Sequence, residues 1–519
     1  MRLLTGWLIA GCTTIWLAIS PPVNGADAAP NPNATLVYFD VVSNQTLDPR
    51  EPQNNSSFAQ GPLMAIYDSL ISFNPAGEPK PGLALSWQYN PDLTEITLKL
   101  RPGVTFHDGS KVDAAAVALN LQRSVALGMR AGAAVIETMN QIAAIETEGD
   151  DIVRLKLKAP NGQMPYLLGT QAGMMISPAS LADDAFGSAL KPVGAGPFKV
   201  RSFESNVRTT MERNDAYWGG KSERPAVIEH HFVSDGRARL NALRSGQANL
   251  ALIEPRSIAE AKAAGLAVLV NEKNSTWNMT FNFKRETTGK LKLRQAILHA
   301  IDREALAEAL GFGASQPTAQ LFAQTSPMYQ KKLDELYPFD QAKARKLLAE
   351  AGYPKGVDIN WMLINTTEYR LLAEALQAML GEVGIGIKFD TVDASQYVLF
   401  RRPPTRGDLL MVRWGGRPDP LQAFQEVVGT GGSIVPGTAV VPEVDTLIDK
   451  ARRLDPANPE RMKVLHELAL LSLEQAAYTG IMTRSNVYAF WPGCISGIPA
   501  YLPTGNDRIN DVSVAMGCK

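Results

Sequence analysis

The side chains best suited to acid–base or metal chemistry are five histidines, and the chain scatters them. They stand at His107, His230, His231, His299 and His466. His230 and His231 are adjacent, so in a strand they would point to opposite faces and make a poor pair of metal ligands. We expect His299 to face solvent, opposite the Ile297 side of its helix. The histidines therefore predict neither a metal site nor a catalytic centre.

The sequence also lacks the familiar catalytic motifs. It contains no G-x-x-x-x-G-K-[ST] phosphate loop, no G-x-S-x-G elbow, no H-E-x-x-H pair and no C-x-x-C. Gly194-Ala195-Gly196 lacks the third glycine of a dinucleotide loop. Carboxylates are plentiful, so an acid–base pair stays open. We predict a binding protein without a cofactor, and the alternative is a secreted hydrolase acting on small amide or ester substrates.

The composition is that of an ordinary globular protein. The 519 residues are 45% hydrophobic and 20% charged. Lys and Arg number 51 against 52 Asp and Glu, which gives a formal net charge of -1. Such a balance offers no broad field to hold a phosphate backbone, so nucleic acid is not an expected partner. The length predicts about three domains.

The first 28 residues are typical of a secretory signal. Arg2 supplies the positive start, Leu3–Ile19 is an apolar stretch, and Ala26-Asp27-Ala28 is a cleavage site. We expect cleavage after Ala28 and a periplasmic location. Two alternatives stay open: a membrane anchor that remains attached, and a lipoprotein box ending at Cys12. The lipoprotein box is less favoured because the apolar run continues past Cys12.

Two cysteines would remain after cleavage, Cys494 and Cys518. Export implies an oxidising compartment. We therefore predict a Cys494–Cys518 disulfide, with two separate thiols as the alternative. A bridge across a loop of this size is worth about 3 kcal/mol and implies no chemistry of its own.

The elements that would position a site alternate between strand and helix. Apolar and polar residues alternate over 96–100, which indicates a half-buried strand. A helix over 341–351 begins after the cap Asp340. Thr366 and Thr367 precede a second helix through Leu372 and Leu380, which Gly384 ends before an alternating strand at 385–389. Helix, glycine and strand in succession are typical of the α/β class. No flexible linker divides the chain, so several domains would be interwoven.

Five stretches in a consistent order carry a resemblance to a known family. They are Pro81–Gly109 (P-G-L-A-x-S-W … L-R-P-G-V-x-F-H-D-G), Gly194–Gly220 (G-A-G-P-F … R-N-x-x-Y-W-G-G), Arg294–Arg303 (R-Q-A-x-x-x-A-I-D-R), Ala342–Gly352 and Trp414–Pro420. Together they resemble the bacterial extracellular solute-binding proteins of family 5, the peptide- and nickel-type receptors of ABC importers.

The resemblance implies the two-lobed fold of a type II periplasmic binding protein with an extra inserted domain. Lobe I would be discontinuous, made of residues 29–75, 187–275 and 488–519. The inserted domain II would cover 76–186, and lobe III would cover 276–487.

The resemblance also implies a function. A monomeric receptor would capture a small or peptide-like solute by lobe closure and deliver it to a membrane permease that a cytoplasmic ATPase drives.

The stretch from Trp414 to Pro420 is where this chain departs from the family. Peptide-binding members resemble one another in a Trp-x-x-Asp stretch whose Asp receives the peptide α-ammonium. Here Arg417 stands three residues after Trp414. A guanidinium fork suits a carboxylate or phosphate, and an indole face can stack on a ring, sugar or cation. We expect a ligand with an acid group; the alternative is that Arg417 pairs with a neighbouring carboxylate.

The remaining candidates flank these two residues. Arg413 precedes Trp414, and Gly415 with Gly416 would allow close approach of the backbone. Asp419 could substitute for the missing acid, although it matches the turn-forming Asp before a proline. The last candidates, Trp277 and Asn278, follow the expected crossover into lobe III.

Overall fold

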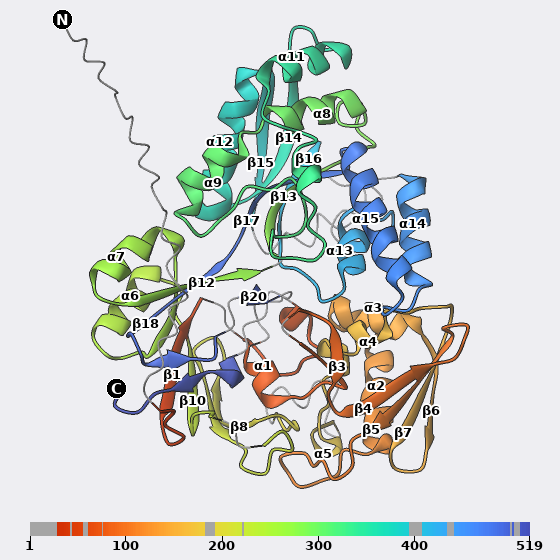
Figure 1. Cartoon of the computed structure of the whole chain (residues 1–519), viewed down its shortest axis with the longest axis vertical. Helices are drawn as coiled ribbons and strands as arrows, with labels where there is room; N and C mark the ends of the chain where they lie inside the picture. Colours follow the sequence, from red (N-terminus) through yellow and green to blue (C-terminus); the bar gives the residue numbers. More distant parts are fainter. Residues whose placement is uncertain are drawn as a thin grey trace, which may run out of the picture.

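The computed structural model describes most of the chain (Figure 1). The described residues are 29–41, 44–55, 61–74, 76–181, 192–220, 223–273, 275–393, 407–432, 441–498, 501–502 and 509–518. The expected signal segment 1–28, with Cys12, lies outside them. In the part that is described, no helix combines the length and the apolar character needed to cross a membrane.

Lobe I is built on an eight-stranded mixed sheet with the strand order β20-β12-β18-β11-β1-β10-β9-β8. Its central strand β1 (Thr35–Asp40) pairs in parallel with β10 (Val227–Phe232) and β11 (Leu250–Ile253). The other strands are β8 (Phe198–Glu204), β9 (Arg208–Arg213), β12 (Ala267–Lys273), β18 (Asn486–Phe490) and β20 (Tyr501–Leu502). Helices of this lobe are α1 (Gly61–Ile66), α6 (Gly236–Arg244) and α7 (Ile258–Ala263).

Domain II is an antiparallel sheet covered by helices. Its strand order is β4-β5-β7-β6. The strands are β4 (Ala84–Tyr89), β5 (Glu95–Leu100), β6 (Ile142–Glu148) and β7 (Ile152–Leu157), and the helices are α2 (Ala114–Leu127), α3 (Ala133–Gln141), α4 (Met164–Leu167) and α5 (Pro178–Leu181). The alternation predicted over 96–100 lies in β5, whose Ile96, Leu98 and Leu100 enter the core. A short pair, β2 (Ile71–Phe73) with β3 (Pro79–Pro81), precedes this sheet.

Lobe III has a five-stranded sheet with the order β15-β14-β16-β13-β17. The strands are β13 (Thr276–Phe281), β14 (Val357–Ile364), β15 (Ile385–Val392), β16 (Leu409–Trp414) and β17 (Tyr478–Thr483). One helical layer holds α8 (Leu291–Ala300), α9 (Arg303–Gly311), α11 (Gln341–Glu350) and α12 (Thr367–Glu382). The other holds α13 (Pro420–Val427), α14 (Pro442–Arg452) and α15 (Pro459–Glu474), and the short α10 (Lys331–Asp334) lies before α11 in the chain.

Strand β16 shows why lobe III needs two helical layers. Successive side chains of a strand point to opposite faces of the sheet. Leu409 and Met411 pack with the α8, α11 and α12 side, whereas Leu410, Val412 and Trp414 pack with α13, α14 and α15. A nearly continuous apolar run is the expected signature of a strand buried on both faces.

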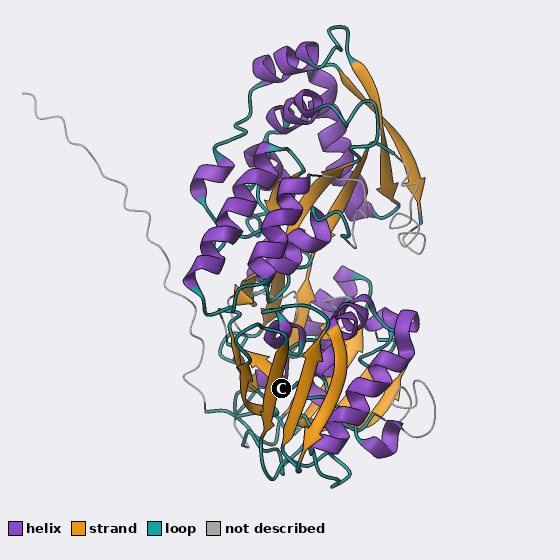
Figure 2. Cartoon of the chain, turned by 90° about the vertical axis from the view of Figure 1, so that its right-hand side faces the viewer, coloured by secondary structure: helices purple, strands orange, loops and turns teal. Residues whose placement is uncertain are grey.

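The chain crosses between the two large sheets twice, from β12 to β13 and from β17 to β18. Figures 1 and 2 show lobe III on one side of these crossovers, with lobe I and domain II together on the other. Residue 487, the expected end of lobe III, falls inside β18 of the lobe I sheet. The second crossover therefore lies a few residues earlier than that expected limit.

The C-terminal tail returns to lobe I. Cys494 and Cys518 form a disulfide with a Cα–Cα distance of 5.5 Å. Between them β19 (Ile495–Ser496) pairs with β21 (Ser513–Val514), and Ile495 and Val514 join the lobe I core. The pairing inferred from the cysteine count is the one in the structure.

His299 differs from the expectation. Its side chain is buried, and its ring packs edge-on against Tyr337 at 5.2 Å. Nδ1 lies 2.8 Å from the carbonyl oxygen of Pro338, and burial lowers the pKa of the imidazole. The prediction of a solvated histidine was wrong because nearly every side of α8 is covered, not only the Ile297 side.

Candidate functional site

The two large sheets turn equivalent edges toward the crossovers. In lobe III, β14 runs parallel to both β15 and β16, so these three strands end on one edge. β13 begins and β17 ends at the same edge. In lobe I, the parallel strands β1, β10 and β11 end near the crossovers in the same way. Ligands of open α/β sheets bind beyond the carboxyl ends of parallel strands. We call the edge of the lobe III sheet where β14, β15 and β16 end the interlobe face.

Trp414 is the last residue of β16 and lies at the interlobe face. Only 2% of its surface is exposed, and it packs into the α13–α15 core. Its Nε1 is buried and, among the described residues, has no hydrogen-bond partner. Ser275 at the first crossover donates from Oγ to the Trp414 carbonyl oxygen at 2.6 Å. Gly416 has a φ of 74°, a left-handed conformation that a glycine adopts without strain, so the chain turns sharply after Gly415.

Arg417 is engaged by a carboxylate of its own lobe. Its Nε and Nη2 donate to the two carboxylate oxygens of Glu426 in α13, both at 3.0 Å. Nη1 donates to the carbonyl oxygen of Gly416 at 3.0 Å, and the guanidinium lies 5.0 Å from the Trp414 ring centroid. Pairing of Arg417 with a neighbouring carboxylate was the alternative that the sequence left open to contact with a ligand. The bidentate fork is already used, so an incoming acid group would have to compete with Glu426.

Arg413 lies on the other face of β16, beside a second arginine. Its Nη1 lies 3.3 Å from a carboxylate oxygen of Glu368, at the start of α12. Arg484, which follows β17, approaches the other oxygen of Glu368 at 3.3 Å. Two guanidinium groups therefore share one carboxylate at the interlobe face. Burial raises the pKa of Glu368, but Arg484 and Arg413 outweigh burial and lower it overall. Sequence reasoning missed Arg484, because no motif marks it.

Trp277 and Asn278 are turned into lobe III. Trp277 is opposite Arg413 in the β13–β16 register, and its ring meets that of Tyr369 edge-on at 4.8 Å. Asn278 is buried and donates from Nδ2 to the Thr276 hydroxyl at 2.7 Å. Both therefore support the sheet edge that carries Arg413 and Trp414.

Asp419 is enclosed. None of its surface is exposed, and its carboxylate accepts two hydrogen bonds from Nη2 of Arg461 in α15, at 2.9 and 2.7 Å. It also caps α13 by accepting from the Leu421 amide at 3.1 Å. Burial alone would lower the pKa of Arg461, but the Asp419 charge raises it overall. The sequence suggested Asp419 as a substitute acid for a ligand; in the structure its oxygens are taken by protein donors.

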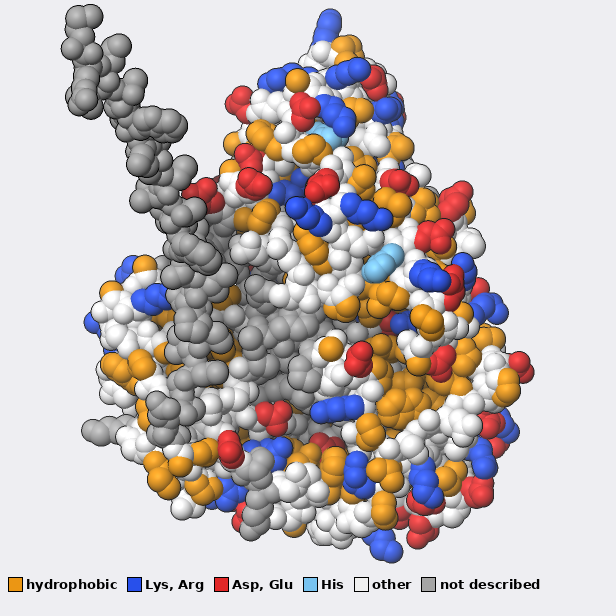
Figure 3. Space-filling view, in the orientation of Figure 1, with side chains coloured by type: hydrophobic (Ala, Val, Ile, Leu, Met, Phe, Trp, Pro, Cys, Tyr) orange, Lys and Arg blue, Asp and Glu red, His pale blue; other side chains and the backbone are white. Residues whose placement is uncertain are grey.

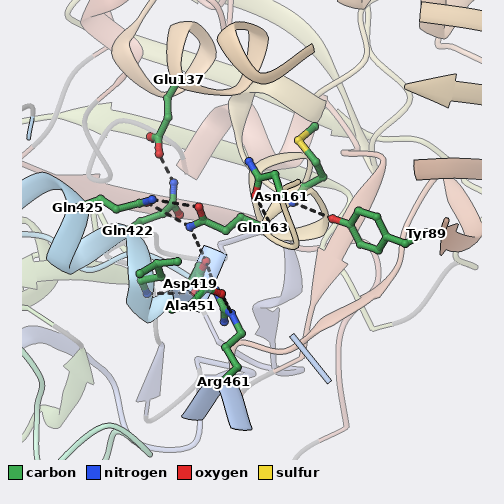
Figure 4. Close-up of polar contacts among 11 residues, drawn as sticks. Tyr89, Glu137, Asn161, Gln163, Asp419, Gln422, Gln425, Ala451 and Arg461 are labelled. Atoms are coloured by element: carbon green, nitrogen blue, oxygen red, sulfur yellow. Dashed lines mark hydrogen bonds and ion pairs between the residues drawn. The ribbon is translucent and has the colours of Figure 1, made fainter. Parts of the chain in front are cut away.

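Figure 4 shows where the third partner of Asp419 comes from. Gln163 of domain II donates from Nε2 to Asp419 at 2.7 Å and exchanges hydrogen bonds with Gln425 at 3.2 and 3.1 Å. The Gly162 amide donates to the Arg452 carbonyl oxygen at 2.8 Å. Glu137 of α3 accepts from Gln422 at 3.4 Å. We call these four links the domain II–lobe III contact.

A cavity of about 850 Å³ opens beside this contact. Its wall is largely apolar and includes Tyr89 and Tyr166 of domain II and Met462 and Leu465 of α15. Figure 3 shows hydrophobic side chains gathered over this junction. The described wall of the cavity includes none of the predicted ligand contacts. Among the described residues, no group of three His, Cys, Asp or Glu side chains is placed to hold a metal.

Comparison with known proteins gives one family and one fold. The model of the bacterial extracellular solute-binding proteins, family 5 Middle, matches residues 78–434. The glutathione-binding protein GsiB of Pectobacterium atrosepticum is 29% identical over 393 residues, which are 75% of this chain and 74% of that protein.

Two solved structures extend the match to nearly the whole chain. AgaA of A. tumefaciens R10 in complex with agropinic acid is 26% identical, with a TM-score of 0.77, over 93% of this chain and 99% of AgaA. NikA of Brucella suis in complex with Fe(III)-EDTA is 24% identical, with a TM-score of 0.80, over 93% of this chain and 100% of NikA.

Proposed function

The chain belongs to the bacterial extracellular solute-binding proteins, family 5, and from this premise we propose that it captures a small solute with an acid group at the interlobe face. The family makes the chain a solute-binding receptor with the fold of the periplasmic binding proteins. The alternative of a secreted hydrolase is wrong, because the relatives are binding proteins of transport systems.

The observation that carries the proposal is the Arg413–Glu368–Arg484 group. Arg413 in β16 and Arg484 just after β17 approach the Glu368 carboxylate at the edge where the chain crosses to lobe I. An acid group there would gain a charge-assisted hydrogen bond to either arginine. The sequence favoured Arg417 for binding the acid group. In our proposal Arg417 instead supports the site through its contact with the Trp414 ring and its ion pair with Glu426.

Two relatives support an acid-bearing solute. GsiB is named for glutathione, and AgaA was solved with agropinic acid. Glutathione has free carboxylates as well as an ammonium group, so an amphoteric peptide-like molecule fits the same expectation. This chain has no aspartate three residues after Trp414. It therefore lacks the residue that would receive a peptide α-ammonium in the Trp-x-x-Asp stretch.

Capture would proceed by lobe closure. Closure removes water from the polar contacts, which strengthens them. A micromolar receptor needs about −8 kcal/mol, which a charged contact, stacking and apolar burial can supply together. We propose that the closed, monomeric protein then docks in the periplasm on an ABC permease driven by a cytoplasmic ATPase.

Titration calorimetry with glutathione as the probe tests the arginine pair. Arg413→Met and Arg484→Met should each weaken binding by about 30-fold or more, the effect of losing a desolvated charged contact. Arg453→Met is the matched control, because Arg453 caps the end of α14 and its pair with Asp449 there is about half exposed. Unchanged affinity in both test variants would overturn this assignment of the acid subsite.

Native mass spectrometry of the protein as purified tests the ligand class independently of glutathione. A retained ligand with at least one acid group is the expected result. A retained ligand without any acid group would contradict the proposal.

A further inference from the structure

Domain II is fastened to lobe I, so its contact with lobe III must separate when the lobes open. Arg123 of α2 forms a buried ion pair with Asp48 of lobe I at 2.7 Å. The Gly132 amide, just before α3, donates to the Arg50 carbonyl oxygen at 2.8 Å, and Gln171 donates to the Asn54 carbonyl oxygen at 2.9 Å. When the lobes hinge at the two crossovers, these links would keep domain II with lobe I, and opening would break the domain II–lobe III contact.

We propose that closure of the lobes takes up one proton at the domain II–lobe III contact, and that Glu137 is the group that receives it. The inference rests on the lobe closure of the proposed function. It concerns a carboxylate on α3 that meets a second carboxylate of lobe III only when the two parts come together.

The geometry places two carboxylates around one guanidinium. Glu426 holds Arg417 through both of its oxygens, so the donor fork has no matching pair left for Glu137. Glu137 receives a neutral donor instead, Nε2 of Gln422, at 3.4 Å. The Oε1 atom of Gln422 is buried and has no partner among the described residues. With the Gln422 amide turned over about its last bond, Oε1 would take the place of Nε2 and accept a proton carried by Glu137. Figure 4 shows Glu137 and Gln422 facing each other across the contact.

The electrostatics of the closed form agree with this geometry. Burial and then the charge of Glu426 raise the pKa of Glu137 to about 7, and Arg417 offsets only part of that rise. Asp419 raises it slightly further. These charged groups all belong to lobe III, so opening removes them and returns Glu137 to water.

The other ionisable groups on elements packed against α3 are held elsewhere. Arg123 of α2 pairs with Asp48. On β6, Glu146 pairs with Lys156 and Glu148 with Arg154 at the surface. Tyr166 of α4 has a pKa raised to about 12 by burial and stays neutral.

The direction of the pH effect follows from linkage. Glu137 binds its proton more tightly in the closed form than in the open form, so acid favours closure. The advantage is lost as the pH rises from the ordinary carboxyl range toward about 7, by at most about tenfold per pH unit. Above that range closure no longer changes with pH through this group, and the charged carboxylate keeps closure at its least favourable. The Gln163 amide, which donates to Asp419 across the same contact, carries no titratable proton in this range.

Hydrogen exchange of the ligand-free protein tests the proposal without any knowledge of the solute. The Gly162 amide reports the contact directly, because its acceptor is the Arg452 carbonyl oxygen of lobe III. Glu137→Gln imitates the protonated carboxyl, and comparing it with the natural chain at one pH cancels the intrinsic pH dependence of exchange. At about pH 8 the segment around Gly162 should exchange tens of times faster in the natural chain than in the variant. At about pH 5 most of that difference should vanish.

Two further variants keep the result interpretable. Glu374→Gln removes an exposed carboxylate of α12 and should leave the exchange at Gly162 unchanged. Gln163→Ala should speed the exchange by the same factor at both pH values, which shows that the amide reports the contact. The proposal would be overturned if the ratio of the Gly162 exchange rates in the natural chain and in Glu137→Gln did not change with pH. Since no ligand is present, that outcome is distinct from a failure of glutathione to bind.

Discussion

Two neighbouring parts of one short segment have opposite surroundings in this protein. Arg413, the residue before the end of β16, has a third of its side chain exposed at the interlobe face, where it shares Glu368 with Arg484. Asp419, six residues later, is fully enclosed by Arg461 and by Gln163 of domain II. The first part faces the region where a solute is expected, and the second joins two structural units.

The difference shows how little the chemical type of a residue says about its role. Arg413 stands beside Trp414 and Asp419 stands between two prolines, and the sequence offered both charged groups as candidate ligand contacts. The surroundings decide which charge is left to recognise a ligand: an exposed pair is weak and open to exchange, whereas a buried pair is saturated by its partners. Changes at the enclosed part should therefore cost stability, and changes at the interlobe face should cost affinity.

The largest expected effect is on the buried ion pair. Arg461→Met leaves the Asp419 charge buried with fewer donors, which should lower the free energy of unfolding by about 3–5 kcal/mol. Denaturant titration of the mature protein measures this loss. Arg453→Met is the matched control, since its pair with Asp449 is half exposed and should change stability by less than about 1 kcal/mol.

A double variant separates the lost pair from lost packing. Adding Asp419→Asn to Arg461→Met removes the stranded charge but keeps an N-cap side chain for α13. It should recover part of the stability. Equal losses in Arg461→Met and Arg453→Met would contradict the distinction between the two parts of the segment.

A smaller effect is expected at Gly162, where the backbone of domain II hydrogen-bonds the backbone of lobe III. A Cβ atom at this position would overlap the Leu454 carbonyl oxygen. Gly162→Ala should therefore push the two units apart, enlarge the radius of gyration in small-angle scattering and cost about 1–3 kcal/mol. Gly381→Ala is the control, because that glycine lies inside α12 with open space around it, and the change should stabilise by up to about 1 kcal/mol. An unchanged radius in Gly162→Ala would contradict a tight contact.

Local patterns in the sequence predicted much of the fold. Alternation found β5, and the capping residues Asp340 and Thr366 accept the backbone hydrogen bonds that begin α11 and α12. These signals act within a few residues, so a single sequence records them. The resemblance to family 5 supplied the two lobes and the inserted domain, which local patterns could not supply.

The candidate site was less predictable, because its contacts join distant parts of the chain. Gln163 meets Asp419 across 256 residues, and no periodicity marks either as the other's partner. Arg484 carries no motif, and its position depends on the end of β17 lying beside the start of α12. Likewise, nothing in the sequence singles out Glu426, among the nearby carboxylates, as the partner of Arg417.

The smallest effect, and the one that tests Arg417 itself, depends on pH. Arg417→Met removes the guanidinium that lowers the pKa of Glu137 and pairs with Glu426, so two carboxylates would face each other without it. At about pH 8 the variant should lose about 1 kcal/mol of unfolding free energy, because the pair is partly screened by solvent. The loss should shrink toward about pH 5, where a proton on Glu137 replaces the missing positive charge. Thermal unfolding at both pH values measures the difference. A loss of the same size at both would mean that Arg417 acts through its packing on Trp414, and its charge would then have no part in balancing the two carboxylates.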